Sequence, residues 1–158
     1  MRLTAPALAA LSLCATLASA DATKTLRAEL STDPSRPFRV ENLAGKMVVR
    51  AGSGPKVVVT VTAHGGDAAT AALLALREVR DERSGEPTLR VQYPLDEHKV
   101  FRYHGGRDED TGFFARLFSG TSQVTYDGRR VSVSSSRGLP LYADVVVEIP
   151  RGAAGTFK

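Results

Sequence analysis

The chain has 158 residues, of which 42% are hydrophobic and 24% are charged, and its formal net charge is +4. These values are typical of one globular domain, and they exclude two large domains and a wholly disordered, collagen-like or coiled-coil chain. The basic residues are scattered among acidic ones rather than gathered with aromatic residues into a stripe, so no nucleic-acid surface is expected.

Residues 1–20 have the pattern of an export signal peptide. Met1 and Arg2 form a short positive start, residues 7–17 form an apolar run, and residues 18–20 form a small-x-small cleavage site. The apolar run is about half the length that a transmembrane helix needs, so we expect no retained membrane span. The sequence therefore predicts export to the periplasm or to the extracellular side of the cell surface.

Cys14 is the only cysteine of the chain. Residues 11–14 faintly resemble a lipoprotein processing box, so lipidation of Cys14 remains an alternative to removal of the whole leader. On the cut after Ala20 the mature chain has no thiol, which excludes both a disulfide and a cysteine nucleophile.

The first part of the mature chain reads as strands. Residues 21–35 are expected to be a linker or an edge segment, and period-two alternation then predicts strands at 38–42, 46–51 and 57–64. In the third strand one face consists of apolar residues that we expect to face the core: Val57, Val59, Val61 and Ala63. Three strands so close together indicate an antiparallel meander.

A helix is expected next. The carboxylate of Asp67 can accept from free backbone amides of the first helical turn, and the alanine-rich stretch that extends to about Arg80 favours a helix. Its apolar residues fall on one stripe at three- and four-residue spacing: Ala69, Ala72, Leu73, Leu76 and Val79. We expect this helix to cover the sheet.

Alternation resumes after this helix and predicts five further strands, at residues 88–93, 99–103, 123–126, 129–134 and 142–149. The abundance of valine agrees, because β-branched side chains pack well on a pleated surface. The predicted fold class is mainly β, an antiparallel meander or β-sandwich with one or two short helices. The domain is expected to span residues 36–152, followed by a tail at 153–158.

Three segments, residues 38–52, 56–62 and 144–152, resemble the bacterial adhesin-like domain family, and the likeness extends over about residues 36–152. This is an exported or envelope-associated group of β-strand-repeat domains whose activity is not established. The resemblance implies a β-sandwich that continues in longer members as a β-solenoid, and it supplies no catalytic residue. Because the family pattern continues past the point where this chain stops, at Lys158, we expect a fragment or a shortened member. Its last strand would then be a bare edge able to pair with another chain.

Few residues suggest a catalytic or metal-binding site. His98, His104 and Asp108 are spaced so that a loop could bring them to one metal ion, which His64 could join from its strand. Against this, the two loop histidines lie in polar or glycine-containing turns, and no cysteine or paired-histidine motif accompanies them. We therefore expect no cofactor, and a metal-dependent exported enzyme that uses this site is the alternative hypothesis.

An apolar cluster lies within the polar, glycine-containing insertion at 104–122. Phe113, Phe114, Leu117 and Phe118 would share one face of a short helix. This face either plugs an open end of the sheet or forms an exposed patch for a partner or a lipid surface.

The hypothesis that these observations favour is a non-catalytic exported binding or scaffold module of the cell envelope. Its expected partner is an envelope protein, a surface, or a second copy that pairs through an edge strand.

Overall fold

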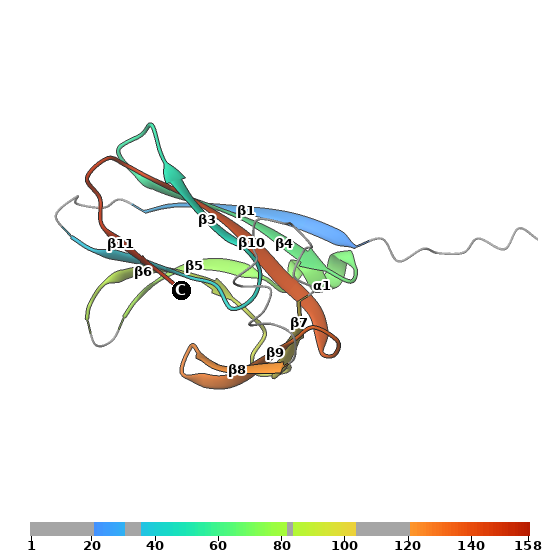
Figure 1. Ribbon diagram of the computed structural model, residues 1–158. Coiled ribbons are helices and arrows are strands. Elements are labelled where there is room, and N and C mark those ends of the chain that lie inside the picture. The colour runs from blue at the N-terminus through green and yellow to red at the C-terminus, as the bar shows by residue number, and fades with distance from the viewer. Residues whose placement is uncertain (1–20, 31–35, 82–83, 104–120) are drawn as a thin grey trace, which may run out of the picture.

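The computed structural model describes residues 21–30, 36–81, 84–103 and 121–158, and within them the fold is mainly β, as predicted (Figure 1). Its elements in chain order are β1 (Ala22–Leu30), β2 (Phe38–Glu41), β3 (Met47–Ala51), β4 (Val57–Gly65), α1 (Ala68–Ala72), β5 (Ala75–Arg80), β6 (Pro87–Gln92), β7 (Val100–Arg102), β8 (Thr121–Tyr126), β9 (Arg129–Ser134), β10 (Leu139–Ile149) and β11 (Gly155–Phe157).

The strands form two sheets. The larger sheet has seven strands in the order β1-β4-β10-β7-β9-β8, and β3 pairs with β10 beside this path. The smaller sheet has the order β11-β2-β6-β5. Figure 1 shows β1, β4, β10 and β3 as one layer above the smaller sheet, while β8 and β9 lie on the smaller sheet's other side. Both sheets mix parallel and antiparallel pairs.

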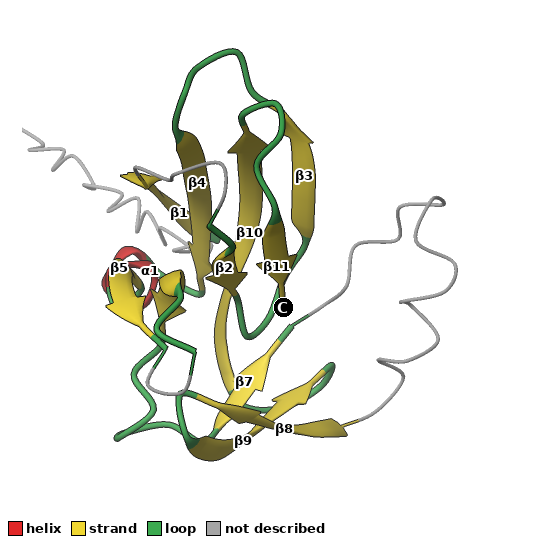
Figure 2. Cartoon of the chain, turned by 90° about the vertical axis from the view of Figure 1, so that its left-hand side faces the viewer, coloured by secondary structure: helices red, strands yellow, loops and turns green. Residues whose placement is uncertain are grey.

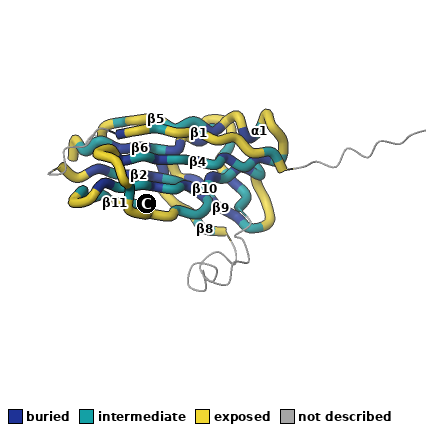
Figure 3. The backbone as a smooth tube through the Cα atoms, turned by 90° about the horizontal axis from the view of Figure 1, so that it is seen from above, coloured by how far each residue is buried: buried dark blue, intermediate teal, exposed yellow. Residues whose placement is uncertain are grey.

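The core lies between the two layers, where Figure 3 shows buried residues along the central strands. The alternation predicted for residues 57–64 is confirmed, because Val57, Val59 and Val61 are fully buried. They pack with inward residues of β10 and of the smaller sheet, which include Val145, Val147, Phe38, Val40, Leu89 and Val91. Burying each valine contributes roughly 1.5–3 kcal/mol, most of it offset by lost chain entropy.

The predicted antiparallel meander is wrong. β2 belongs to the smaller sheet, and β10 separates β3 from β4. Val145 of β10 lies opposite Val61 in an antiparallel pair and opposite Met47 in a parallel pair. Alternation specifies which side chains face the core, but it says nothing about which strand lies alongside.

The predicted helix is much shorter than expected. Asp67 caps it as predicted, because its Oδ1 accepts from the Thr70 amide at 2.6 Å, but α1 ends at Ala72. The expected second half is instead β5, in which Leu76 lies opposite Val91 of β6. Helix propensity is a weak preference, and pairing with a neighbouring strand overrides it here.

The C-terminal end of the domain also differs from the expectation. Residues 153–158 are more than a tail, because they contain β11, whose Phe157 packs edge-on against Phe38 with ring centroids 5.9 Å apart. The strand expected as a bare edge, β10, is instead central. At the other end, β1 pairs with β4 along its whole length and forms an edge of the larger sheet.

Two buried tyrosines form hydrogen bonds through their hydroxyl groups. Tyr126 of β8 donates to the carbonyl of Val91 at 2.7 Å, and Tyr93 lies 2.9 Å from Oδ1 of Asn42. Burial raises the pKa of both hydroxyls, because a phenolate would lose its hydration inside the core.

The raised pKa values predict a cooperative alkaline transition. In the unfolded chain a tyrosine hydroxyl ionises near pH 10. Burial of the neutral hydroxyls therefore contributes its full stabilisation below this pH, and the stabilisation is lost as the pH rises above it. The chain has four tyrosines and no tryptophan, so the ultraviolet absorbance of tyrosinate can be followed beside circular dichroism. We expect Tyr93 and Tyr126 to ionise in the same step in which the β signal is lost, and Tyr126→Phe to reduce the absorbance change of that step. Complete ionisation with an intact β signal would contradict this prediction.

A glycine, Gly45, allows the β2–β3 turn to lie close to the backbone of β10. Gly45 has φ +121°, and a Cβ at this position would lie 1.9 Å from the carbonyl oxygen of Ala143. We expect Gly45→Ala to lower the free energy of unfolding by about 3 kcal/mol or more, measured by urea denaturation. Gly54→Ala is the matched control, because no atom lies within 4 Å of its Cβ position, and it should change stability by less than about 0.5 kcal/mol. Equal effects of the two substitutions would show that this close approach is not required.

Candidate functional site

The residues predicted for a metal site are only partly described. His98 lies in a turn after β6, where its amide donates to the carbonyl of Pro94 at 3.0 Å. His104 and Asp108 lie outside the described residues, so their proximity to His98 stays a prediction. The described part of the chain contains no group of three histidine, cysteine or acidic residues that could hold a metal ion.

The apolar cluster of Phe113, Phe114, Leu117 and Phe118 also lies outside the described residues. Its two alternatives, a plug and an exposed patch, both stay predictions. Among the described helices, none has the length and apolarity that crossing a membrane requires.

His64, the third histidine considered, lies on the outer face of the larger sheet. Its Nε2 is 3.2 Å from Oδ2 of Asp144, and its ring stacks on Tyr142 with centroids 4.5 Å apart. Burial, reinforced by the Asp144 carboxylate, raises the pKa of Tyr142 and of Tyr103 beside it. The other carboxylate oxygen of Asp144 accepts from the Lys46 amide at 2.9 Å. This cluster therefore holds the start of β3 against β10.

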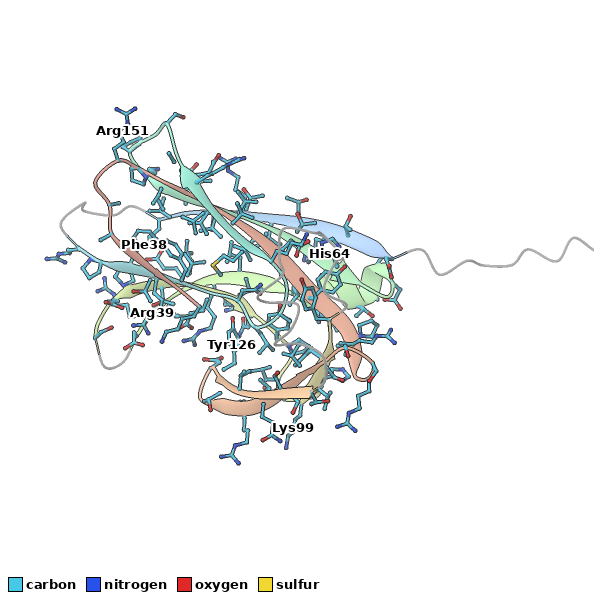
Figure 4. The ribbon with its side chains drawn as sticks, viewed as in Figure 1. Phe38, Arg39, His64, Lys99, Tyr126 and Arg151 are labelled. Carbon is cyan, nitrogen blue, oxygen red and sulfur yellow. The ribbon has the colours of Figure 1, made fainter. Side chains whose placement is uncertain are left out.

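A second charged cluster covers the outer face of the smaller sheet (Figure 4). Arg39 contacts Asp81 at 3.0 Å and Glu86 at 2.8 Å, and Nε of Arg90 donates to Glu41 at 2.7 Å. Burial of Arg90 opposes its charge, but the bond to Glu41 and the nearby carboxylates outweigh this effect and raise the pKa of Arg90. The cluster joins β2, β6 and the β5–β6 turn by ion pairs, so its carboxylates are already engaged by arginine.

The outer edge of β3 has no partner strand among the described residues, as Figure 2 shows. The amide of Val145 donates to the carbonyl of Lys46 at 2.8 Å, and the amide of Gly52 donates to Ile149 at 2.7 Å. In a parallel ladder of this register, Val48 and Arg50 direct their backbone groups toward β10. The N–H and C=O groups of Met47, Val49 and Ala51 consequently point to the open side.

The side chains along this edge are unusually apolar. Val48 is 51% exposed on the outer face, and Val49 is 40% exposed although it lies on the core side of the strand. Edge strands are commonly protected from pairing by charged residues. The edges β1 and β5 carry such residues, which are Lys24, Arg27, Glu29, Arg77, Glu78 and Arg80. Across Met47–Val49, β3 has none, and the remaining long edge, β8, surrounds its exposed valine with polar residues.

A shallow depression of about 270 Å³ borders the end of β3. Its apolar lining comes from two segments about a hundred residues apart, and consists of Val49, Ala51, Ile149, Pro150 and Ala153. Arg50 and Arg151 also border it, and Figure 4 shows Arg151 pointing away from the body of the sheets. We call the free side of β3 together with this depression the β3 edge. Sequence analysis missed it, because the adjacency of β3 to residues 149–153 depends on the parallel pairing with β10.

Comparisons of the chain with protein-family models, with curated proteins and with solved structures found no match.

Two proline substitutions test the direction of the backbone groups at the β3 edge. Val48→Pro removes an N–H directed at β10 and should lower the free energy of unfolding by about 3 kcal/mol or more. Val49→Pro removes an N–H directed at the open side, and edge strands tolerate proline there, so we expect a loss of about 1 kcal/mol or less. Urea denaturation of both variants measures the difference. A larger loss for Val49→Pro than for Val48→Pro would show that the open side is the other one.

Proposed function

We propose that this protein is an exported, non-catalytic binding module of the bacterial cell envelope, adhesin-like, which captures an extended segment of a partner along the β3 edge. The observation that carries the proposal is the open row of backbone groups at Met47, Val49 and Ala51 beside exposed apolar side chains. An added strand gains affinity from main-chain hydrogen bonds, and its side chains give specificity.

The exposed valines support this use of the edge. A strand added beside β3 would cover Val48 on the outer face and Val49 on the core face, because side chains of neighbouring strands lie side by side. Covering them removes apolar surface from water, which contributes roughly 25 cal/mol for each Å² buried. Binding would thus extend both the ladder and the hydrophobic contact of the larger sheet.

The position of β1 is compatible with export. The expected cleavage lies between Ala20 and Asp21, and β1 begins at Ala22, which lies opposite Gly65 of β4. Removal of the leader at this point would leave the whole β1–β4 ladder intact. The envelope location and the adhesin-like character rest on the leader pattern and on the resemblance of residues 36–152.

Hydrogen–deuterium exchange tests strand addition directly. The probe is a short end-capped peptide of alternating threonine and valine. In the free domain we expect rapid exchange of the amides of Met47, Val49 and Ala51, because they face solvent. With the peptide in excess, we expect slower exchange at these three amides and unchanged exchange at the outer edges of β1, β5 and β8.

Val49→Pro is the control, because it should abolish this protection while the domain remains folded. The protein used is the secreted form of the full chain, whose mass should correspond to a mature protein that begins at Asp21. Retention of residues 1–20 would contradict removal of the leader after Ala20. Protection at another edge, or at none, would overturn the proposed use of β3.

A further inference from the structure

We propose that the segment captured by the β3 edge is acidic: an extended peptide places an apolar side chain in the depression and an aspartate or glutamate beside Arg151. This inference rests on the proposed function and adds the chemical class of the partner.

Arg151 is the cation that carries the argument. It is exposed, borders the depression, and forms no ion pair within the described residues. Two other exposed cations of this layer already have carboxylate partners. Nζ of Lys56 lies 3.1 Å from Glu29, and Arg50 contacts Glu148 at 2.7 Å. A carboxylate brought to this end of β3 would therefore find an available guanidinium, which suits a carboxylate in shape and charge.

The depression supplies the apolar part of the recognition. Val49 and Ala51 lie on the core side of β3, so the core-side residues of an added strand would lie next to them. The depression continues from these two residues to Ile149 and Pro150 of the neighbouring segment. An apolar residue of the peptide would enter it while the next residue along the strand, on the opposite face, remains near the rim.

The same charges argue against a second copy of this chain as the occupant. If β3 paired antiparallel with β3 of another molecule, Val49 would lie opposite its own equivalent, and Val48 opposite Arg50. Both copies would bring Arg50 and Arg151 to one interface, where Glu148 pairs with Arg50 in each copy. Like charges along a shared edge disfavour association, whereas an acidic strand would reduce the positive excess.

Three end-capped peptides test the proposal. They share the alternating threonine–valine sequence and differ at one residue near the end that would lie beside Ala51, which is threonine, glutamate or lysine. Binding is measured by fluorescence anisotropy at low ionic strength. On the wild-type domain we expect the glutamate peptide to bind about tenfold more tightly than the lysine peptide, because an exposed attraction replaces an exposed repulsion.

Variants of the exposed Arg151 locate the effect. Arg151→Ala should remove most of the preference for glutamate, and Arg151→Glu should reverse it, without change in the melting temperature. Arg80→Ala on β5 is the matched control, because it removes another exposed arginine far from the β3 edge and should leave the preference unchanged.

The outcomes separate the two proposals. If the neutral peptide protects the β3 amides but glutamate and lysine peptides bind equally, the acidic partner is overturned and the binding function stands. If no peptide protects the β3 amides, the binding function itself is overturned. A dimer in sedimentation experiments that Val49→Pro abolishes would replace the acidic peptide by a second copy of the chain.

Discussion

The antiparallel pairing of β4 with β10 is the interaction on which the rest of the fold depends. The inward residues of both strands are buried, and Val61 lies opposite Val145 in the middle of the ladder. Because β10 takes the position beside β4 that a meander would give to β3, β3 must pair on the far side of β10. It pairs there in parallel, and among the described residues its other side has no partner strand. The candidate binding edge is therefore a consequence of how the core is built.

The sequence predicted which faces are buried much better than which strands are neighbours. Alternation at residues 57–64 identified the inward side chains correctly, because that signal depends only on the local pleat. The partner of β4 lies some eighty residues away along the chain, and no local pattern records it. The residues after Ala72 are another case in which a non-local contact decides the structure. Their apolar spacing suits a helix, but they pair with β6 and form a strand. The exposure of Val49 could not be predicted either, since its alternation assigns it to the core and only its edge position exposes it.

The outer faces of the two sheets differ in how their charges are used. On the smaller sheet Arg39 and Arg90 are surrounded by carboxylates, so the ion pairs are largely satisfied within the domain. Such mutual pairs add modestly to stability and leave little charge to attract a ligand. On the larger sheet Asp144 holds the start of β3 through the Lys46 amide, while Arg151 at the other end has no ion pair with any residue that the structure describes. The fold thus fixes the position of β3 at its beginning and leaves a positive charge available at its end.

An open apolar edge usually invites pairing with identical molecules, and proteins commonly prevent this by placing charge within the edge strand. Here the middle of β3 is uncharged and Arg151 lies near its end, so strand addition is not blocked, and an incoming strand with a carboxylate at that end is favoured. The β3 strand of a second copy offers no acidic residue for this ion pair, whereas an acidic segment gains both the ladder and the ion pair. Arg151 would then both attract an acidic strand and repel a basic one. Interfaces that share a common backbone geometry often achieve specificity through such charges.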